Sequence, residues 1–207
     1  MLICIMKIKW YICYIKHKTI KMKKIITLFA LAVSAFGIAQ ESSKWTVGFG
    51  VNAIDNTSTQ DAVYFQTKDW NVAPVISKFS ASYDVQQHLA VGTEVAINKY
   101  MANKLHNGVQ GAITSDLNFI AVDVNAKYNV DHFFTQSKWF DASVIGGVGF
   151  FWLGTEANQS VNPGVALDFW LADGYGIRLQ TLGRVALDNN KIGNNHIQHS
   201  VEFIFKF

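Results

Sequence analysis

The chain has 207 residues, of which 50% are hydrophobic and 16% charged, so it is too apolar for a disordered protein and long enough for one medium domain. Its formal charge of +3 arises at the amino-terminal end, where seven of the 18 basic residues precede the first acidic residue, Glu41. The remainder has 11 basic and 15 acidic residues, a formal charge of −4, which argues against a nucleic-acid binder.

The first predicted element is an export signal. The stretch "MKKIITLFALAVSAFGIAQ" has a basic start at Met22, an apolar run from Ile25 to Phe36 and small residues at Gly37 and Ala39, which is typical of a secretory signal peptide. We therefore expect a signal at 22–39, cleaved after Ala39. Its apolar run is shorter than the roughly 18 to 20 residues of a membrane-spanning helix.

Residues 1–21 place a second apolar and basic stretch in front of this complete signal, so we expect them to be an extension upstream of the true start. Both cysteines, Cys4 and Cys13, lie in this extension. The exported domain, 40–207, is then expected to contain neither a thiol nor a disulfide.

From about residue 40 onward, apolar and polar residues alternate with a period of two, which predicts β-strands. In "KWTVGFGVNA", for example, Trp45, Val47, Phe49 and Val51 alternate with small or polar residues. The same pattern predicts seven further strands, at 73–84, 88–99, 117–129, 139–153, 163–172, 175–186 and 195–207.

The connections between these strands alternate in length. Longer polar stretches follow the first, third, fifth and seventh strands, and tighter links follow the even-numbered ones, as in outer-membrane barrels. Pro74 and Pro163 are predicted at strand starts, where a missing backbone donor costs least. The sequence therefore predicts an all-β fold, an eight-stranded antiparallel up-and-down transmembrane β-barrel.

Charged residues indicate which face of the barrel is inside. Nearly all strand charges have the parity opposite to the apolar residues, and Lys99, at a strand end, is the exception. A soluble barrel with an apolar core, such as a periplasmic ligand carrier, would cover its polar, solvent-facing side with Lys and Glu. Here the polar face has mostly small residues and few charges, which favours the narrow lumen of an eight-stranded barrel. We expect a lumen charge network of Glu94, Asp123, Lys127, Asp168, Arg178 and Arg184. Asp168 and Arg178 flank the tight "ADGY" turn, so they are expected to form a cross-strand pair.

Aromatic residues near strand ends are typical of the girdles at membrane interfaces. The predicted girdle comprises Trp45, Tyr83, Tyr128, Phe140 and Trp152. The last strand, "HIQHSVEFIFKF", ends on an aromatic residue and resembles the carboxy-terminal assembly signal of outer-membrane proteins, with Val201, Phe203, Phe205 and Phe207 as its residues.

The segments "KWTVGFGVNAIDN", "DASVIGGVGFFWLG" and "HIQHSVEFIFKF" resemble the transmembrane barrel domains of OmpA-like proteins of Gram-negative bacteria. This resemblance implies a location in the outer membrane, contact with its lipid and with the barrel-assembly machinery, and a role in envelope integrity, adhesion or limited permeation. A peptidoglycan-binding domain, common in that family, is not part of the resemblance. The resemblance does not identify a ligand that the surface loops bind.

Chemical sites are weakly indicated. "GGVGFF" lacks the following helix of a phosphate loop, and His196 and His199 should point to opposite faces of a strand, so we expect neither a cofactor nor a metal. Some eight-stranded outer-membrane barrels modify lipid A, and the second long loop offers His106, Ser115 and Asp116 for such chemistry without fixing a nucleophile beside a base. We therefore expect a non-enzymatic protein with a structural, envelope-integrity or surface-interaction role. The alternatives are a narrow channel or porin and a lipid-modifying outer-membrane enzyme.

Overall fold

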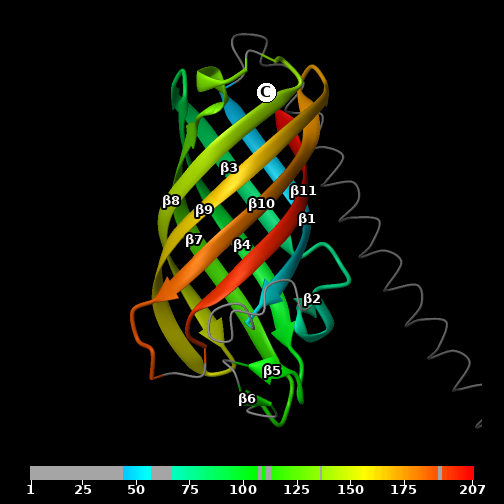
Figure 1. Cartoon of the computed structure of the whole chain (residues 1–207), viewed down its shortest axis with the longest axis vertical. Helices are drawn as coiled ribbons and strands as arrows, with labels where there is room; N and C mark the ends of the chain where they lie inside the picture. Colours follow the sequence, from blue (N-terminus) through cyan, green and yellow to red (C-terminus); the bar gives the residue numbers. More distant parts are fainter. Residues whose placement is uncertain (1–43, 57–66, 107–108, 111–112, 136, 191–192) are drawn as a thin grey trace, which may run out of the picture. The chain divides into compact units, whose positions relative to one another are not determined.

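Eight long strands form a closed antiparallel β-barrel (Figure 1). The structure is a computed structural model that describes residues 44–56, 67–106, 109–110, 113–135, 137–190 and 193–207. The barrel strands are β1 (Trp45–Asp55), β3 (Lys78–Gln86), β4 (Leu89–Tyr100), β7 (Leu117–Asn129), β8 (Phe140–Leu153), β9 (Glu156–Ala172), β10 (Tyr175–Ala186) and β11 (His196–Lys206). The predicted fold class is confirmed, whereas the predicted extension, signal peptide and cysteines lie outside the described residues.

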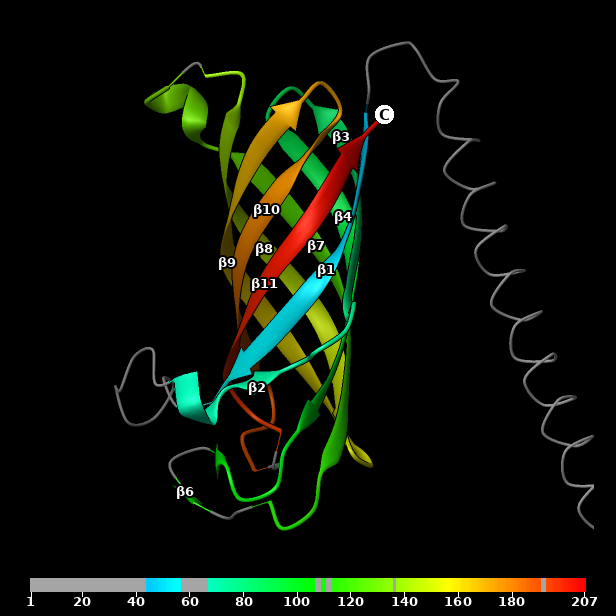
Figure 2. The ribbon, with the colours of Figure 1, turned by 90° about the vertical axis from the view of Figure 1, so that its right-hand side faces the viewer.

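Each strand pairs with its neighbours in the chain, and the barrel closes where β11 pairs with β1 (Figure 2). The closing ladder runs from Thr46 opposite Lys206 to Asp55 opposite Ile197. Because the first and last strands satisfy each other's backbone groups, the described wall of the barrel has no free sheet edge. Such closure is what a sheet needs in order to be stable in hydrocarbon.

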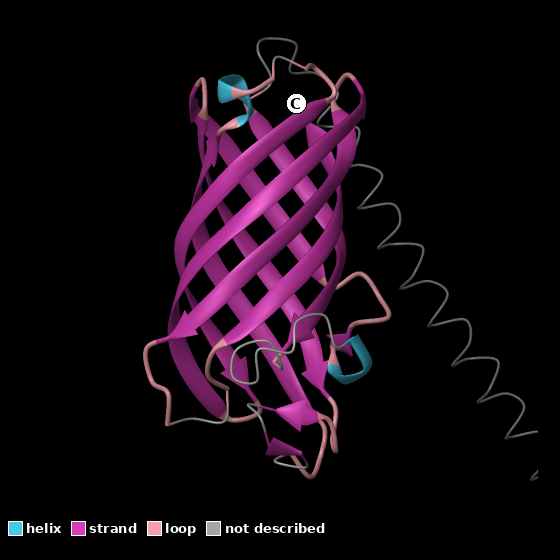
Figure 3. Cartoon of the chain, viewed as in Figure 1, coloured by secondary structure: helices cyan, strands magenta, loops and turns pink. Residues whose placement is uncertain are grey.

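The two ends of the barrel differ. At one end, called here the terminal end, β1 begins at Trp45 and β11 ends at Lys206. The β3–β4, β7–β8 and β9–β10 connections lie at the same end (Figure 3). The other end, called here the loop end, carries four connections. The β1–β3 connection contains η2 (Thr67–Asp69) and β2 (Asn71–Val72), and the β4–β7 connection contains β5 (Leu105–His106) and β6 (Val109–Gln110). The β8–β9 and β10–β11 connections lie at the same end. Helix η3 (Asp131–Phe133) belongs to the β7–β8 connection at the terminal end. Among the described residues, the helices are too short to cross a membrane.

Strand β9 corrects the predicted strand at 163–172 and its long preceding loop. It begins at Glu156, so the β8–β9 connection is a tight turn rather than a long polar loop. Gly154 in this turn has a φ of +61°, a conformation that residues with a Cβ adopt at a cost. The alternation of apolar and polar residues is weak in "GTEANQSVN", and this hid the strand from the sequence pattern.

The two prolines also differ from expectation. Pro163 lies within β9, opposite Gly146 of β8, and the β9–β10 ladder is interrupted beside it. Because proline has no backbone N–H, it fits only where such a ladder bond is absent. Pro74 lies in the bend before β3, which therefore begins at Lys78 rather than at residue 73.

Candidate membrane-facing surface and charged lumen

The outer surface of the barrel is apolar and exposed, and the inner surface is polar and buried. On β7, Val122 and Val124 point outward with exposed fractions of 40% and 56%, whereas Ala121 and Asp123, which alternate with them, are fully buried. The same alternation continues around the barrel, so the predicted parity is confirmed. The exposed surface has the composition of a face that contacts lipid, not water. Lys99 lies outside, as predicted, where it pairs with Asp116.

The predicted girdle residues lie at strand ends. Trp45 lies opposite Tyr83, with ring centroids 5.1 Å apart, and Tyr128 and Phe140 share this terminal end. Trp152 lies at the loop end. The aromatic residues are not restricted to the ends, however, because three outward phenylalanines lie further along the wall, Phe49, Phe79 and Phe203.

The β7–β8 connection extends the aromatic surface at the terminal end. Phe133 at the end of η3, Phe134 directly after it and Trp139 before β8 are 72%, 64% and 61% exposed. The ring of Trp139 lies 6.2 Å from that of Phe169 on the outer wall. Aromatic side chains that are both exposed and continuous with an apolar wall are typical of a membrane–water interface.

Inside the barrel, Asp168 and Arg178 form the predicted cross-strand pair. The two residues face each other in the β9–β10 ladder. Arg178 Nε donates to Asp168 Oδ1 and Arg178 Nη2 to Asp168 Oδ2, both at 2.7 Å. This two-bond geometry fixes both side chains and adds to the strength of the pair.

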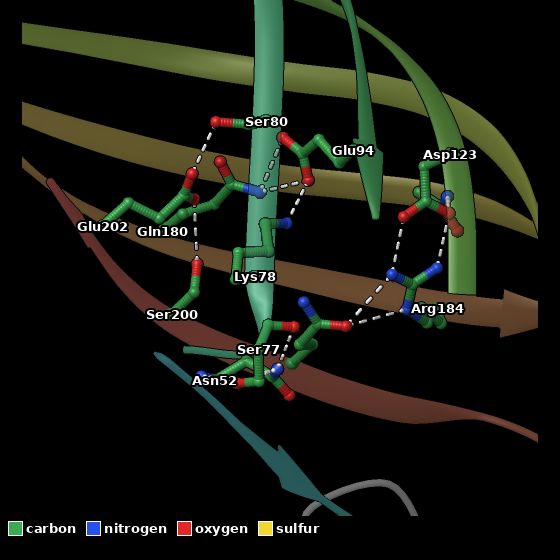
Figure 4. A network of polar contacts seen from close by, with 12 residues as sticks. Asn52, Ser77, Lys78, Ser80, Glu94, Asp123, Gln180, Arg184, Ser200 and Glu202 are labelled. Atoms are coloured by element: carbon green, nitrogen blue, oxygen red, sulfur yellow. Dashed lines mark hydrogen bonds and ion pairs between the residues drawn. The ribbon is translucent and has the colours of Figure 1, made fainter. Parts of the chain in front are cut away.

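A second bidentate pair joins Arg184 to Asp123 inside the barrel (Figure 4). The bonds are 2.5 Å from Nη1 to Oδ1 and 2.6 Å from Nη2 to Oδ2, and both side chains are fully buried. Asn162 also donates to Asp123, at 2.8 Å, and Gln198 accepts from Arg184. The sequence pattern missed these two amides, because uncharged residues of inward parity are too common to single out.

A third pair joins Lys78 to Glu94, and Gln180 donates to the same carboxylate at 2.9 and 3.0 Å (Figure 4). Lys78 has the inward parity but was not among the predicted network residues. Its strand position would have revealed it, because Lys78 lies opposite Ala96, two residues from Glu94 on the same face of β4.

Lys127 corrects the predicted network. Its ammonium nitrogen is buried, but it has no hydrogen-bond partner in the part of the chain that the structure describes. The predicted residues therefore form two separate bidentate pairs and a third pair at Glu94, and Lys127 interacts with Asp168 and Glu94 by charge attraction without a hydrogen bond.

The lumen is closed near the loop end by a cluster of rings that we call the aromatic plug: Tyr100, Phe119, Phe151 and His196. Phe119 lies 5.6 Å from Tyr100, 5.9 Å from Phe151 and 5.3 Å from His196, measured between ring centroids. All four side chains are buried. A filled interior is expected for an eight-stranded barrel, because its lumen is just wide enough for side chains.

The residues considered for enzymatic chemistry have separate neighbours. His106 is buried beside the aromatic plug, where its ring lies 5.4 Å from that of Tyr100. Ser115 is exposed, and Asp116 accepts from the backbone of Ala102 and pairs with Lys99. These three residues therefore do not form a nucleophile with an adjacent base.

The two histidines of β11 face opposite sides, as predicted. His196 belongs to the aromatic plug, whereas His199 points outward and stacks on Trp70 at 4.7 Å. The "GGVGFF" segment lies within β8, as expected for strand residues. Among the described residues, no group of three histidine, cysteine or acidic side chains could hold a metal ion.

On the last strand, Val201, Phe203 and Phe205 point outward and are exposed. Phe207 follows the end of β11. Val201, Phe203 and Phe205 thus form an apolar row on the outer wall, in the strand that closes the barrel against β1.

The architecture is similar to that of solved structures of small outer-membrane β-barrels. Neisserial surface protein A matches over 81% of this chain and 98% of its own, with a TM-score of 0.52 and 13% identity. The chain has the fold of the small outer-membrane β-barrels. The amino-terminal barrel domain of Pseudomonas aeruginosa OprF also matches, with a TM-score of 0.49 and 11% identity over 81% of this chain and 100% of that one.

The outer membrane protein Ail of Yersinia pestis is similar as well, with a TM-score of 0.47 and 10% identity over 80% of this chain and 100% of that one. No family model and no curated protein matches the sequence. At these identities the likeness concerns the fold alone.

Proposed function

We propose that this chain is an integral protein of the bacterial outer membrane with a structural or surface-interaction role. The observation that carries the proposal is the arrangement of the two faces: an exposed apolar wall surrounds a lumen with buried, paired charges. Only a surrounding lipid phase makes this arrangement favourable, because the wall would otherwise expose a large apolar surface to water.

The proposed orientation places the terminal end in the periplasm and the loop end outside the cell. Short turns on the periplasmic side and longer loops outside are the rule for bacterial barrels. The apolar row of Val201, Phe203 and Phe205, with Phe207, is proposed as the signal that the barrel-assembly machinery recognises. Outer-membrane lipid is the proposed partner of the wall.

The loop end supports a surface-interaction role because part of it is held rigidly. Asn98 donates to the side chain of Asn52 at 2.7 Å and to the backbone of Asn71 at 2.9 Å, and Asn71 accepts from the backbone of Met101 at 2.8 Å. These bonds fasten the β1–β3 connection to β4. A rigid platform loses less entropy when it binds a partner.

Cell fractionation tests the location. We expect the protein in the outer-membrane fraction, and we expect an unheated sample to migrate differently from a heated one in electrophoresis, because the barrel resists detergent until heated. Recovery in the soluble periplasmic fraction would contradict the proposal.

The role can be tested in cells that lack the protein. If it maintains the envelope, these cells become sensitive to detergent, and a variant with a scrambled 101–116 connection restores resistance as well as the native protein does. If it acts through surface contacts, only the native connection restores the lost adhesion or binding.

A further inference from the structure

The terminal end of the lumen contains a cavity of about 80 Å³ that is open to solvent. Gln87 and His88 of the β3–β4 turn contribute to its lining, which places the opening at this end of the barrel. Its charged lining residues are Asp84, Lys127, Asp141, Asp168, Arg178 and Lys206.

Each acidic group in this cavity already has a partner. Asp168 accepts two bonds from Arg178, and Asp84 pairs with Lys206 at 2.9 Å. Asp141 accepts a bond of 2.6 Å from the indole nitrogen of Trp170. Arg178 and Lys206 are engaged by the same contacts, and Asp141 has the neutral indole as its partner. Among the charged lining residues, Lys127 alone has neither an ion-pair nor a hydrogen-bond partner in the described part of the chain.

Lys127 is therefore the exception within the cavity. Its ammonium is buried without a hydrogen-bond acceptor among the described residues. The carboxylates of Asp168, Glu94 and Glu202 attract its charge without accepting a bond from it, so its donors stay unsatisfied. Its side chain lines this cavity and also a deeper one beside Ser80 and Glu94. Rotation about its flexible four-carbon stem can turn the ammonium into the larger cavity.

We propose that this cavity is a binding site for a small oxyanion, a phosphate or carboxylate group, with Lys127 as its cationic anchor. A lysine ammonium binds such groups as a point charge and needs neutral donors to complete their coordination. Ser143 and Asn129 line the same cavity, and a hydroxyl and an amide can donate to an oxyanion; Ser82 also lines it, but its hydroxyl donates to the backbone of Thr46 at 3.5 Å and would have to turn. The inference depends on the lumen alone and not on the proposed cellular role.

Calorimetric titration of the purified full-length protein with inorganic phosphate tests the site. Dodecyl maltoside is a suitable detergent because it carries neither phosphate nor carboxylate, and chloride keeps the ionic strength constant. We expect saturable binding of one phosphate per protein and at least tenfold weaker binding for Lys127→Met. Lys99→Met, which removes an exposed lysine at the loop end, should bind as the native protein does.

Two further measurements sharpen the test. Lys127→Met should unfold at a higher urea concentration than the native protein in phosphate-free buffer, so its weaker binding would not result from misfolding. Acetate and glycerol phosphate, titrated in parallel, distinguish a carboxylate ligand and a lipid headgroup from free phosphate by their relative affinities. The proposal is overturned if none of the three anions binds saturably, or if Lys127→Met binds them as tightly as the native protein.

Discussion

Removal of Arg184 tests whether the charge pairs of the lumen are dry. Arg184→Ala leaves the Asp123 carboxylate fully buried, with Asn162 as its remaining side-chain donor. Loss of one partner of a buried pair costs about 3 to 5 kcal/mol, because the other charge stays desolvated without compensation. We therefore expect Arg184→Ala to lower the free energy of unfolding by about that amount.

A double-mutant cycle separates the pair from the lost packing of the side chain. Asp123→Asn should be similarly costly alone, but Arg184→Ala combined with Asp123→Asn should cost much less than the sum of the two. The coupling energy is expected to exceed about 2 kcal/mol, within the range found for contacting charged residues. Equilibrium unfolding of the barrel from lipid vesicles by urea, followed by tryptophan fluorescence, measures each variant.

The pair between Lys206 and Asp84 provides the matched control. It has a similar distance, 2.9 Å, but its side chains are 36% and 31% exposed at the terminal end. Solvent screens such a pair, so its coupling should stay below about 1 kcal/mol. Equal coupling energies for the two pairs would refute a dry lumen and would show that water reaches Asp123.

Three other predictions concern the wall, the packing of the lumen and the aromatic plug. Val124→Arg should lower the free energy of unfolding in vesicles by about 2 to 4 kcal/mol, because it places a charge in lipid. Asn125→Ser, one residue further and facing the lumen, should lower it far less. Similar penalties would mean that inside and outside are assigned wrongly. Gly149→Ala should destabilise the barrel by about 1 to 3 kcal/mol, because the added Cβ would lie 2.0 Å from Asp123 Oδ1, whereas Gly146→Ala meets nothing within 4 Å and should be nearly neutral in the same unfolding assay. Planar-bilayer recordings should show no single-channel steps for the native protein, since the aromatic plug fills the lumen, and regular steps would instead favour the channel hypothesis.

Much of the fold could be predicted because membrane barrels obey a strict period of two. The charges of one parity identified the lumen, and the turn between Asp168 and Arg178 was short enough to set their register. Strand β9 was predicted too short, because its first residues, from Glu156 to Asn162, include few large apolar side chains. Pairing with β8, from Leu153 opposite Glu156 to Gly147 opposite Asn162, holds that extension, and a period of two alone does not reveal it.

The lumen was less predictable than the wall. Parity places Asp123 and Arg184 inside, but their contact joins β7 to β10, which are not neighbours in the sheet. Whether two inward charges meet across the lumen depends on strand tilt and side-chain length. The lack of a partner for Lys127 has the same origin, because other contacts already engage the nearby carboxylates of Glu94 and Asp168.

The central claim is that the exposed apolar wall faces lipid and the charged face lines the lumen. Spin labels placed one at a time on residues 119–126 of β7, after Cys4 and Cys13 are replaced by serine, test it most directly in lipid vesicles. Accessibility to oxygen, which concentrates in lipid, should alternate along the strand and be high at positions 120, 122, 124 and 126. High accessibility of these positions to a water-soluble nickel complex, or no alternation at all, would contradict the account.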